Sequence, residues 1–389
     1  MNIEITKQYF NRLIQTELIL KLGEKIHRYT YANQNRRMKQ SLNRFKICQN
    51  KKPKDLIRKE IKACHDFWKC YPLHYFRYNL YKLNYNLGLE DLLSYIPEFF
   101  FYVLFLPHYD SKKYETLIID KNITELVFSS LSIGQPKTIC KIIENKFYSK
   151  NLTKIDFANI KNSILNNNYN KIFIKPALGY GGEDICVFKK NKDGIFINKF
   201  NLKFNEDFIK KKCKEKDYII QAGVTQHEFL SKIYPESVNS LRIITENKNE
   251  MPKILHAILR MGRNGSEFDN INQNGLFTDI NIENGSLGKF ACADNCEKFL
   301  MHPNTKFVFK DAIIPKWNII TEFVKESAGK LPIFKYLAWD IVLTNEKPLA
   351  IEANLNYGLD GWQIVCGGLR KIYGIEDPKY YWKNKGKRI

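Results

Sequence analysis

The chain has 389 residues and a net charge of +21, and its length exceeds the size at which a single core stops growing, so we expect two or three subdomains. Its nine cysteines form no CxxC pair and no zinc spacing with histidine, which argues against a disulfide framework and for free thiols. The longest apolar block, Phe99–Pro107, is too short for a transmembrane helix, and Met1–Thr6 does not resemble a signal peptide. These features predict a cytoplasmic protein.

Positive charge is concentrated in the N-terminal region. Residues 1–80 contain 18 Lys and Arg against 6 Asp and Glu, and apolar positions at helical spacing predict helices over residues 1–70 with basic outer faces. Such a skew indicates an anionic partner, and charge alone does not choose among nucleic acid, an acidic membrane surface and an anionic glycan. The aromatic stretch Tyr71–Tyr85 lacks an RNA-binding signature, so no nucleic acid is expected, whereas peripheral membrane contact through this region stays open.

A lysine and a glycine-rich turn mark the middle of the chain. Lys171–Pro176 is predicted to be a strand with Lys175 near its end, and Ile185–Lys189 is predicted to be the next strand. The turn between them contains Gly179, Gly181 and Gly182. Glycines can take positive φ and bring backbone N–H groups close to a ligand, so this turn can cover phosphates. Its spacing is neither that of the P-loop nor that of the dinucleotide fingerprint.

The next predicted strand is a candidate for binding a nucleotide base through its backbone. Tyr218–Val224 is apolar, and such a strand often offers its backbone to adenine, here over Gln221 to Val224. An acidic residue that takes the ribose hydroxyls commonly follows, and Glu228 stands at a suitable distance. A surface glutamate on a helix is an equally good interpretation of Glu228.

Two arginines lie within apolar strand runs that follow. Arg242 belongs to Ser237–Thr245 and Arg260 to Ile254–Arg263, and an arginine is rarely buried in such a run unless it is paired. Planar guanidinium groups suit phosphate or carboxylate oxygens. The residues that we expect at a substrate are Asn239 and Ser240 before the first strand and Asp269 and Asn270 in a long polar loop.

The most informative stretch is a predicted hairpin near the C-terminus. Two apolar runs flank the turn residues 345–347, and with a three-residue loop antiparallel pairing places Asp340 opposite Glu352. Asn354 shares a face with Glu352 because side chains alternate along a strand. Facing carboxylates destabilise a sheet unless a partner neutralises them, and a hard cation such as Mg²⁺ prefers oxygen ligands. Splaying of both carboxylates into solvent is the alternative.

In this order the elements resemble the ATP-grasp superfamily. The segments SVNSLRIIT, LRMGRNGSEFDNINQNG and LAWDIVLTNEKPLAIEANLNYGLDGWQ are similar to its sugar-transfer-associated branch, found among bacterial polysaccharide-synthesis proteins. The resemblance covers roughly Tyr95 to Tyr373. It implies an α+β, ATP-grasp fold, in which two α+β subdomains clamp ATP, preceded here by the basic helical N-terminal region. The expected parts are residues 1–90 (basic helical region), 91–150 (start of the core), 151–235 (lid with the flap), 236–375 (metal-site subdomain) and 376–389 (basic tail).

The resemblance also implies a role for each site residue. Lys121 and Lys175 would contact ATP phosphates, with Lys175 also catalytic; Gly179, Gly181 and Gly182 would form the flap; Gln221 to Val224 and Glu228 would hold adenosine. Asp340, Glu352 and Asn354 would bind two Mg²⁺ ions, Arg242 and Arg260 would act on the transferred phosphoryl group, and Asn239, Ser240, Asp269 and Asn270 would contact substrate.

The implied chemistry is ATP-dependent activation of a carboxylate to an acyl phosphate, followed by attack of an amine to give an amide. The substrates would be small carboxylates and amines, sugar-linked and anionic, on the route to capsule or another surface polysaccharide. A kinase on the same fold is the first alternative, and a basic binding protein with a vestigial ATP site is the second. The oligomeric state has no signature in the sequence.

Overall fold

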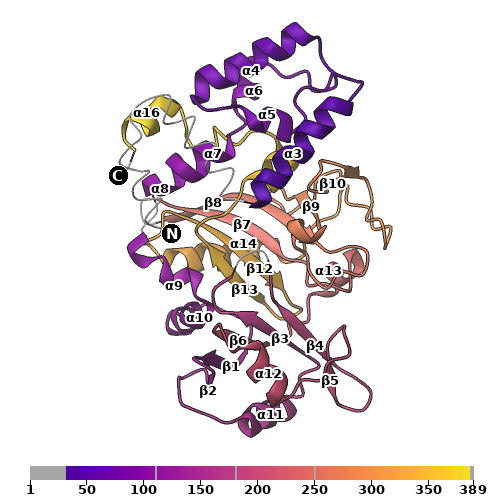
Figure 1. Ribbon diagram of the computed structural model, residues 1–389, viewed down its shortest axis with the longest axis vertical. Coiled ribbons are helices and arrows are strands. Elements are labelled where there is room, and N and C mark those ends of the chain that lie inside the picture. Colours follow the sequence, from indigo (N-terminus) through magenta and orange to yellow (C-terminus); the bar gives the residue numbers. More distant parts are fainter. Residues whose placement is uncertain (1–31, 110–111, 180–181, 249–250, 386–389) are drawn as a thin grey trace. The chain divides into compact units, whose positions relative to one another are not determined.

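The computed structural model describes residues 32–109, 112–179, 182–248 and 251–385, so the predicted helices before residue 32 lie outside the described residues. The chain forms two compact units (Figure 1). Unit 1 consists of residues 1–110, 292–299 and 356–389, and unit 2 consists of residues 111–291 and 300–355. The five-part division expected from the sequence stays a prediction. None of the described helices is both long and apolar enough to cross a membrane.

Unit 1 is helical. Its elements are α3 (Ala32–Ile47), α4 (Lys54–Trp68), α5 (Leu73–Arg77), α6 (Leu89–Leu93), α7 (Glu98–Phe100), the π-helical turn η1 (Phe101–Phe105), α8 (Leu106–Tyr109), α15 (Asp360–Cys366) and α16 (Pro378–Lys383). The short strands β10 (Ala291–Cys292) and β11 (Lys298–Phe299) border its inserted segment. The predicted helical character of the N-terminal region is confirmed for the residues that the structure describes.

Helix α4 shows why this region is basic outside and apolar inside. Ile57, Cys64 and Trp68 are buried at helical spacing. The buried Glu60 on the same face is neutralised by Lys52, whose Nζ lies 2.7 Å from the Glu60 carboxylate. The exposed positions of the helix include Lys54, Arg58, Lys59 and Lys62. The basic residues of α4 therefore lie mainly on its solvent face, as the sequence predicts.

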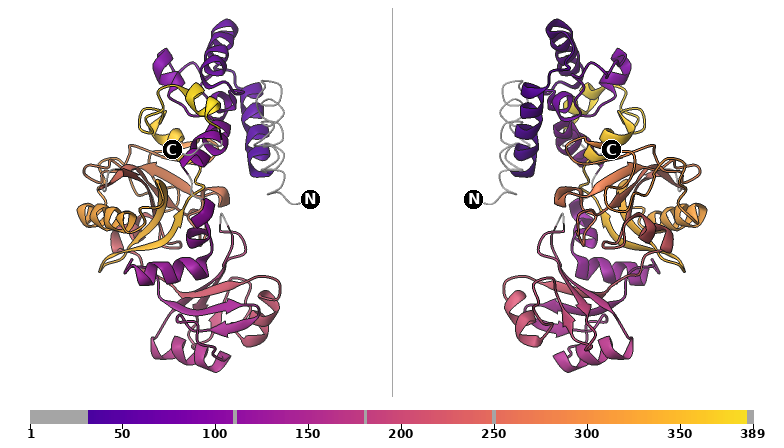
Figure 2. Two further views of the ribbon diagram at one scale, coloured as in Figure 1. Left: turned by 90° about the vertical axis from the view of Figure 1, so that its left-hand side faces the viewer. Right: turned by 90° about the vertical axis from the view of Figure 1, so that its right-hand side faces the viewer.

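Unit 2 contains two antiparallel sheets and the helices that cover them (Figure 2). The first sheet has the order β2-β1-β6-β3-β4-β5, with β1 (Thr138–Ile143), β2 (Lys146–Tyr148), β3 (Lys171–Pro176), β4 (Cys186–Lys190), β5 (Phe196–Ile197) and β6 (Tyr218–Ala222). In unit 2 the second sheet has the order β9-β8-β7-β12-β13, with β7 (Leu241–Lys248), β8 (Met251–Met261), β9 (Leu276–Asp279), β12 (Tyr336–Leu343) and β13 (Pro348–Asn354).

The remaining elements of unit 2 are helices. They are η2 (Lys112–Tyr114), α9 (Thr116–Ile119), α10 (Lys121–Ser130), α11 (Phe157–Asn166), α12 (Glu206–Lys212), α13 (Glu228–Ile233), η3 (Ile271–Gln273) and α14 (Trp317–Gly329). Helices α11 and α12 bury their apolar residues on one face of the first sheet, against side chains such as Ile172, Ile174 and Ile220. Because side chains alternate along a strand, Lys175 and Gln221 are directed to the opposite face.

Candidate functional site

The candidate site is built on a row of charged residues across three neighbouring strands of the second sheet. Arg242 on β7 is directly opposite Asp340 on β12, and Asp340 is directly opposite Glu352 on β13. Residues that face each other across antiparallel strands have neighbouring side chains. The pairing of Asp340 with Glu352 that the sequence predicts is therefore confirmed.

The hairpin reaches this pairing by a different route from the one expected. Leu343 pairs with Pro348, so the loop has four residues, Thr344–Lys347, and not three. That loop alone would place Asp340 opposite Ile351. A bulge shifts the register between Asp340 and Ile341, where the partners jump from Glu352 to Ala350. The extra residue restores the facing carboxylates, which the apolar pattern of the strands did not reveal.

Asp340 is bound by both arginines. Its Oδ1 and Oδ2 accept hydrogen bonds from Arg242 Nε and Nη2 at 2.6 and 2.7 Å, and Arg260 Nη2 lies 3.0 Å from Oδ2. Burial by itself raises the pKa of this carboxyl group, but the charges of Arg242 and Arg260 outweigh burial and lower the pKa. The structure thus explains how two arginines are accommodated in apolar strands.

Two lysines approach the same carboxylates from the first sheet and from α10. Lys121 Nζ lies 3.4 Å from Glu352 Oε1 and donates to the carbonyl oxygen of Gly179 at 3.2 Å. Lys175 Nζ donates to Gln221 Oε1 at 3.0 Å. Burial lowers the pKa of Lys175 to about 8, with a further lowering from Lys121 that Glu352 and Asp340 oppose. The lysines are therefore brought together with the row on the second sheet.

The glycine-rich turn is described in part. Gly181 lies outside the described residues, whereas Gly179 meets Lys121 through its carbonyl group and Gly182 takes a φ of +73°. A Cβ atom added to Gly182 would lie 3.3 Å from the side-chain nitrogens of both Asn270 and Gln273. The turn therefore contacts the loop that the sequence marks as a substrate loop.

The predicted adenine strand is β6 and the residues after it. Ala222 N–H donates to the carbonyl oxygen of Lys137, and Gly223 N–H donates to that of Lys171. Glu228 begins α13 and is exposed, and its N–H donates to Asn345 Oδ1 at 3.3 Å. None of the interactions of Glu228 that the structure describes involves the charged row, so its role at the ribose stays a prediction.

The predicted substrate residues divide into two groups. The Asn239 amide is buried and donates to the carbonyl oxygens of Leu230 and Tyr234, which ties α13 and the residue after it to the segment that precedes β7. Ser240 and Asp269, in contrast, reach the charged row. The N–H and hydroxyl of Ser240 bond Asp269 Oδ2, and Arg260 Nη2 donates to Ser240 Oγ at 2.6 Å. Asn270 lies beside Gly182.

Sequence reasoning missed Gln221 as the partner of Lys175 and missed Glu267, whose carboxylate lies 2.7 Å from Lys189 Nζ on β4. The signal for Gln221 was present, because it alternates with buried apolar residues on β6. Nothing in the local pattern marks Glu267, since its partner is distant in the sequence.

The oxygen donors of the row fit a hard divalent cation. Glu352 has a half-buried side chain, 30% exposed, with one lysine contact at 3.4 Å. The Asn354 amide nitrogen is 3.5 Å from the Ala338 carbonyl oxygen, so the amide oxygen is the atom that would act as a ligand. Both Asp340 oxygens are bound by arginine, so a cation would share this carboxylate with Arg242 and Arg260. Carboxylate and amide oxygens are the donors that Mg²⁺ prefers.

Comparison with known families agrees with the motifs. Residues 102–372 match the model of a family described as sugar-transfer associated ATP-grasp. The match spans more than two thirds of the chain and confirms the resemblance inferred from the sequence. No curated protein matches the chain.

The solved structures that match the chain do so at low sequence identity. Biotin carboxylase from Campylobacter jejuni is 10% identical with a TM-score of 0.38, over 69% of this chain and 46% of that one. D-alanyl-alanine synthetase A from Vibrio cholerae is 12% identical with a TM-score of 0.36, over 71% and 63%. Carboxyaminoimidazole ribonucleotide synthase from Aspergillus clavatus is 9% identical with a TM-score of 0.40, over 68% and 54%. This chain thus spans less than two thirds of the length of each of them.

Proposed function

The chain belongs to the sugar-transfer associated ATP-grasp family, and we propose that it is an ATP- and Mg²⁺-dependent ligase that joins a carboxylate to an amine. The observation that carries the proposal is the register Arg242–Asp340–Glu352, met by Lys121 and Lys175 from other elements of unit 2. Four cationic side chains around two carboxylates suit a reaction whose transition state concentrates negative charge on phosphoryl oxygens.

Each residue has a distinct task in this proposal. Lys121 and Lys175 bind the phosphates of ATP beneath the turn of Gly179, Gly181 and Gly182. Glu352 and Asn354, with Asp340, hold the Mg²⁺ ions, two in number in this proposal. Bound Mg²⁺ would neutralise phosphate charge and orient the transferred group. The strand Gln221 to Val224 and Glu228 bind adenosine, and neither role is needed for the chemistry itself.

The arginines act on the transferred phosphoryl group. Arg242 and Arg260 are held by Asp340, so their planar donors are fixed in direction before substrate arrives. In the proposed reaction a carboxylate oxygen attacks the γ-phosphorus of ATP and ADP leaves. The amine nitrogen then attacks the acyl carbon, phosphate leaves, and the amine loses a proton. Fixed charges lower the barrier because they need no reorganisation during the step.

The acceptor that we propose is an anionic precursor of capsule or another surface polysaccharide. The basic excess of residues 1–80 supports an acidic ligand. A cytoplasmic location, and peripheral contact of the basic N-terminal region with an acidic membrane, belong to the same proposal. They rest on charge and not on a described contact.

The experiment that tests this function follows both products of ATP. The protein is incubated with Mg-ATP and a panel of sugar acids and amines, and ADP and free phosphate are quantified in parallel. We expect equal amounts of ADP and free phosphate, formed only when a carboxylate and an amine are both present. ADP without free phosphate would show that the phosphoryl group stays on the acceptor and would replace the ligase by a kinase. Failure to bind Mg-ATP at all would favour a binding protein with a vestigial site.

A further inference from the structure

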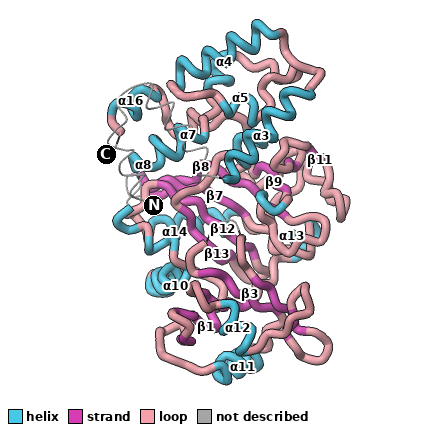
Figure 3. Tube along the Cα trace, in the orientation of Figure 1, coloured by secondary structure: helices cyan, strands magenta, loops and turns pink. Residues whose placement is uncertain are grey.

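Residues 262–275 form the loop between β8 and β9 (Figure 3). Side chains of this loop contact the β3–β4 hairpin, which carries the glycine-rich turn. Lys189 Nζ on β4 lies 2.7 Å from Glu267 Oε1, and Gln273 Nε2 donates to the carbonyl oxygen of Gly182 at 3.3 Å. The two contacts reach the hairpin at different points, one on β4 and one in the turn. The loop is therefore attached to the hairpin at two places.

The same loop is attached to the charged row of the second sheet. Asp269 Oδ2 accepts hydrogen bonds from the backbone N–H of Ser240, at 3.0 Å, and from its hydroxyl. It lies 3.6 Å from Arg260 Nη2, which in turn lies 3.0 Å from Asp340 Oδ2. Asp269 and Asp340 thus hold the guanidinium of Arg260 between them, together with the Ser240 hydroxyl.

The base of the loop is fixed by bonds that do not involve the charged row. Gly262 N–H donates to Ser237 Oγ at 3.1 Å, and the Gly262 carbonyl oxygen is 2.9 Å from His302 Nε2. Arg263 Nε donates to the Asn274 carbonyl oxygen at 2.7 Å and closes the loop across its neck. A loop closed in this way is expected to shift as a body, so that its contacts on the hairpin and on Arg260 depend on each other.

We propose that Glu267 and Asp269 are positioning residues that fix the β3–β4 hairpin relative to the guanidinium group of Arg260. The proposal rests on the proposed function, in which Lys175 and the turn bind phosphates and Arg260 acts on the transferred group. Glu267 anchors the loop on β4 through Lys189, and Asp269 sets the direction of the Arg260 guanidinium. When the glycine-rich turn binds a phosphate of ATP, the loop thereby also places Arg260 at the phosphoryl group that is transferred.

Reversing the charges of the Lys189–Glu267 ion pair tests this coupling in the absence of substrate. Hydrogen exchange is followed for the backbone amides of residues 182–190 and 263–275 in the nucleotide-free, full-length protein. We expect Lys189→Glu and Glu267→Lys each to speed exchange in both segments about two- to five-fold, which is the range for a partly exposed ion pair. The double variant should return both segments to the wild-type rates.

The matched control is Lys190→Glu, on the neighbouring residue of the same strand, whose Nζ contacts Asn168 and not the loop. It should leave exchange in residues 263–275 unchanged. Equal exchange in the single variants and the wild type would overturn the proposal, as would a double variant as labile as the singles. This experiment involves no substrate, so its outcome does not depend on whether the enzyme proves to be a ligase or a kinase.

The second anchor is tested with Asp269→Asn, which keeps the size of the side chain and removes its charge. With Mg-ATP and a carboxylate and amine that support turnover, we expect the rate of ADP formation to fall about ten-fold while the Kd for Mg-ATP changes less than two-fold, because Arg260 is misdirected and ATP is still bound. Asp269→Glu should recover part of the rate. An unchanged rate, or a loss confined to the Kd, would show that Asp269 does not position Arg260.

Discussion

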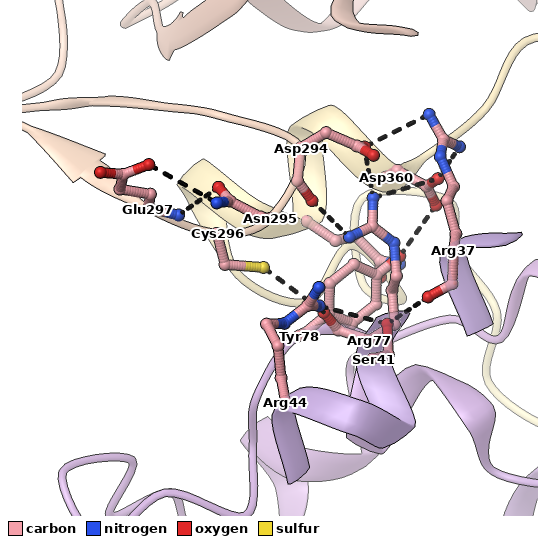
Figure 4. A network of polar contacts seen from close by, with 11 residues as sticks. Arg37, Ser41, Arg44, Arg77, Tyr78, Asp294, Asn295, Cys296, Glu297 and Asp360 are labelled. Carbon is pink, nitrogen blue, oxygen red and sulfur yellow. Dashed lines mark hydrogen bonds and ion pairs between the residues drawn. The ribbon is translucent and has the colours of Figure 1, made fainter. Parts of the chain in front are cut away.

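Both units contain arginines that meet two aspartates, and the two networks differ in what they leave unsatisfied. In unit 1 (Figure 4), Arg77 Nη1 and Nη2 donate to the carbonyl and carboxylate oxygens of Asp294, each at 2.6 Å. Arg37 bonds Asp360 and lies 3.3 Å from Asp294 Oδ1. The Tyr78 hydroxyl also donates to Asp360, at 3.4 Å. Each aspartate therefore has more than one donor from the helices α3 and α5.

In unit 2 the balance is different. Asp340 is as well satisfied as the aspartates of unit 1, because both arginines bind it. Among the described residues the Glu352 carboxylate has one ion pair, at 3.4 Å from Lys121 Nζ, and Lys175 has a neutral partner in Gln221. Carboxylate and ammonium groups thus stand close together with capacity for further partners.

The comparison separates a structural network from a candidate site. In unit 1 the pairs join segments distant in the sequence, the helices α3 and α5, the insertion 292–299 and α15, and carboxylates that are each met by two arginines suit this task. In unit 2 the incomplete pairing of Glu352 and Lys175 suits a ligand that brings both phosphate oxygens and a cation. The arginine–aspartate pairs are alike in the two networks. The difference lies in Glu352 and Lys175, which have fewer charged partners among the described residues.

The largest effect is expected for Glu352→Ala. Of the two carboxylates in the charged row, Glu352 has fewer partners among the described residues. Its loss should reduce Mg-ATP turnover about 10³-fold, within the range for removing one group that stabilises the transition state. The thermal midpoint should change little, because the one ion pair of the Glu352 carboxylate with a described residue is long, at 3.4 Å. Turnover is measured by ADP formation and stability by circular dichroism. Wild-type turnover in the folded variant would remove Glu352 from the site.

Breaking the network of unit 1 should instead cost stability. Arg77→Met leaves the Asp294 carboxylate without its main partner, and we expect the free energy of unfolding to fall by about 3 kcal/mol. Arg58→Met is the control, since the Arg58–Asp55 pair is largely exposed and should contribute less than about 1 kcal/mol. Urea unfolding measures both. Equal losses in the two variants would contradict a structural role for the Arg77 pairs.

The pKa of Lys175 predicts how ATP affinity depends on pH. Burial lowers this pKa to about 8, so the free protein loses the ammonium charge as the pH rises through 8. ATP phosphates favour the protonated form, and each pH unit above about 8 should weaken Mg-ATP binding by up to ten-fold. Lys175→Arg should remain charged and remove this dependence up to pH 10. Equilibrium binding between pH 6.5 and 10 gives the result, and a flat wild-type profile would count against contact with phosphate.

The same pKa predicts a smaller effect on stability. The ammonium form of Lys175 is disfavoured by folding, so the penalty is present below pH 8 and is relieved as the pH rises from about 8 towards the ordinary lysine range. Lys175→Met should therefore stabilise the ligand-free protein at pH 7, by about 1–3 kcal/mol, and should lose this advantage near pH 10. Thermal unfolding at the two pH values tests the sign.

The smallest effect is expected at Gly182. Both Gly182 and Gly194 have positive φ, of +73° and +79°, so alanine should cost each position about 1 kcal/mol. A Cβ at Gly182 also presses on Asn270 and Gln273, whereas at Gly194 it meets one lysine carbon at 3.8 Å. We expect Gly182→Ala to slow Mg-ATP turnover about three-fold more than Gly194→Ala. Equal rates would mean that the turn acts independently of the loop.

Local patterns predicted much of the candidate site. Alternation in β12 and β13 identified the facing carboxylates, and glycines between two strands identified the turn. The expected loop of three residues was wrong, and the bulge at Ile351 compensated for the extra loop residue. The apolar pattern is the same for a three-residue loop without a bulge and for a four-residue loop with one, so the sequence could not distinguish them. Partners such as Gln221 for Lys175 depend on which strands are neighbours, and β3 and β6 are separated by two strands in the sequence.

The sequence did not show which segments of the chain come together in unit 1. Residues 292–299 lie more than 200 positions from Arg77, and their attachment to the N-terminal helices depends on long-range ion pairs. The buried amide of Asn239 shows a second limit of sequence patterns. Its position before a strand predicts a substrate contact, and the sequence does not reveal that the amide also donates to two backbone carbonyl groups, a need that arises only after the chain has folded.

The most direct test of the distinction between the two networks is the increase in thermal midpoint that Mg-ATP produces in the wild type, Glu352→Ala and Arg77→Met. A ligand present at a hundred times its Kd stabilises the folded state by about 2.7 kcal/mol. We expect Glu352→Ala to keep the ligand-free midpoint and lose most of the increase, whereas Arg77→Met should start from a lower midpoint and show the full increase. A full increase in Glu352→Ala, or its loss in Arg77→Met, would contradict the assignment of the nucleotide site to unit 2.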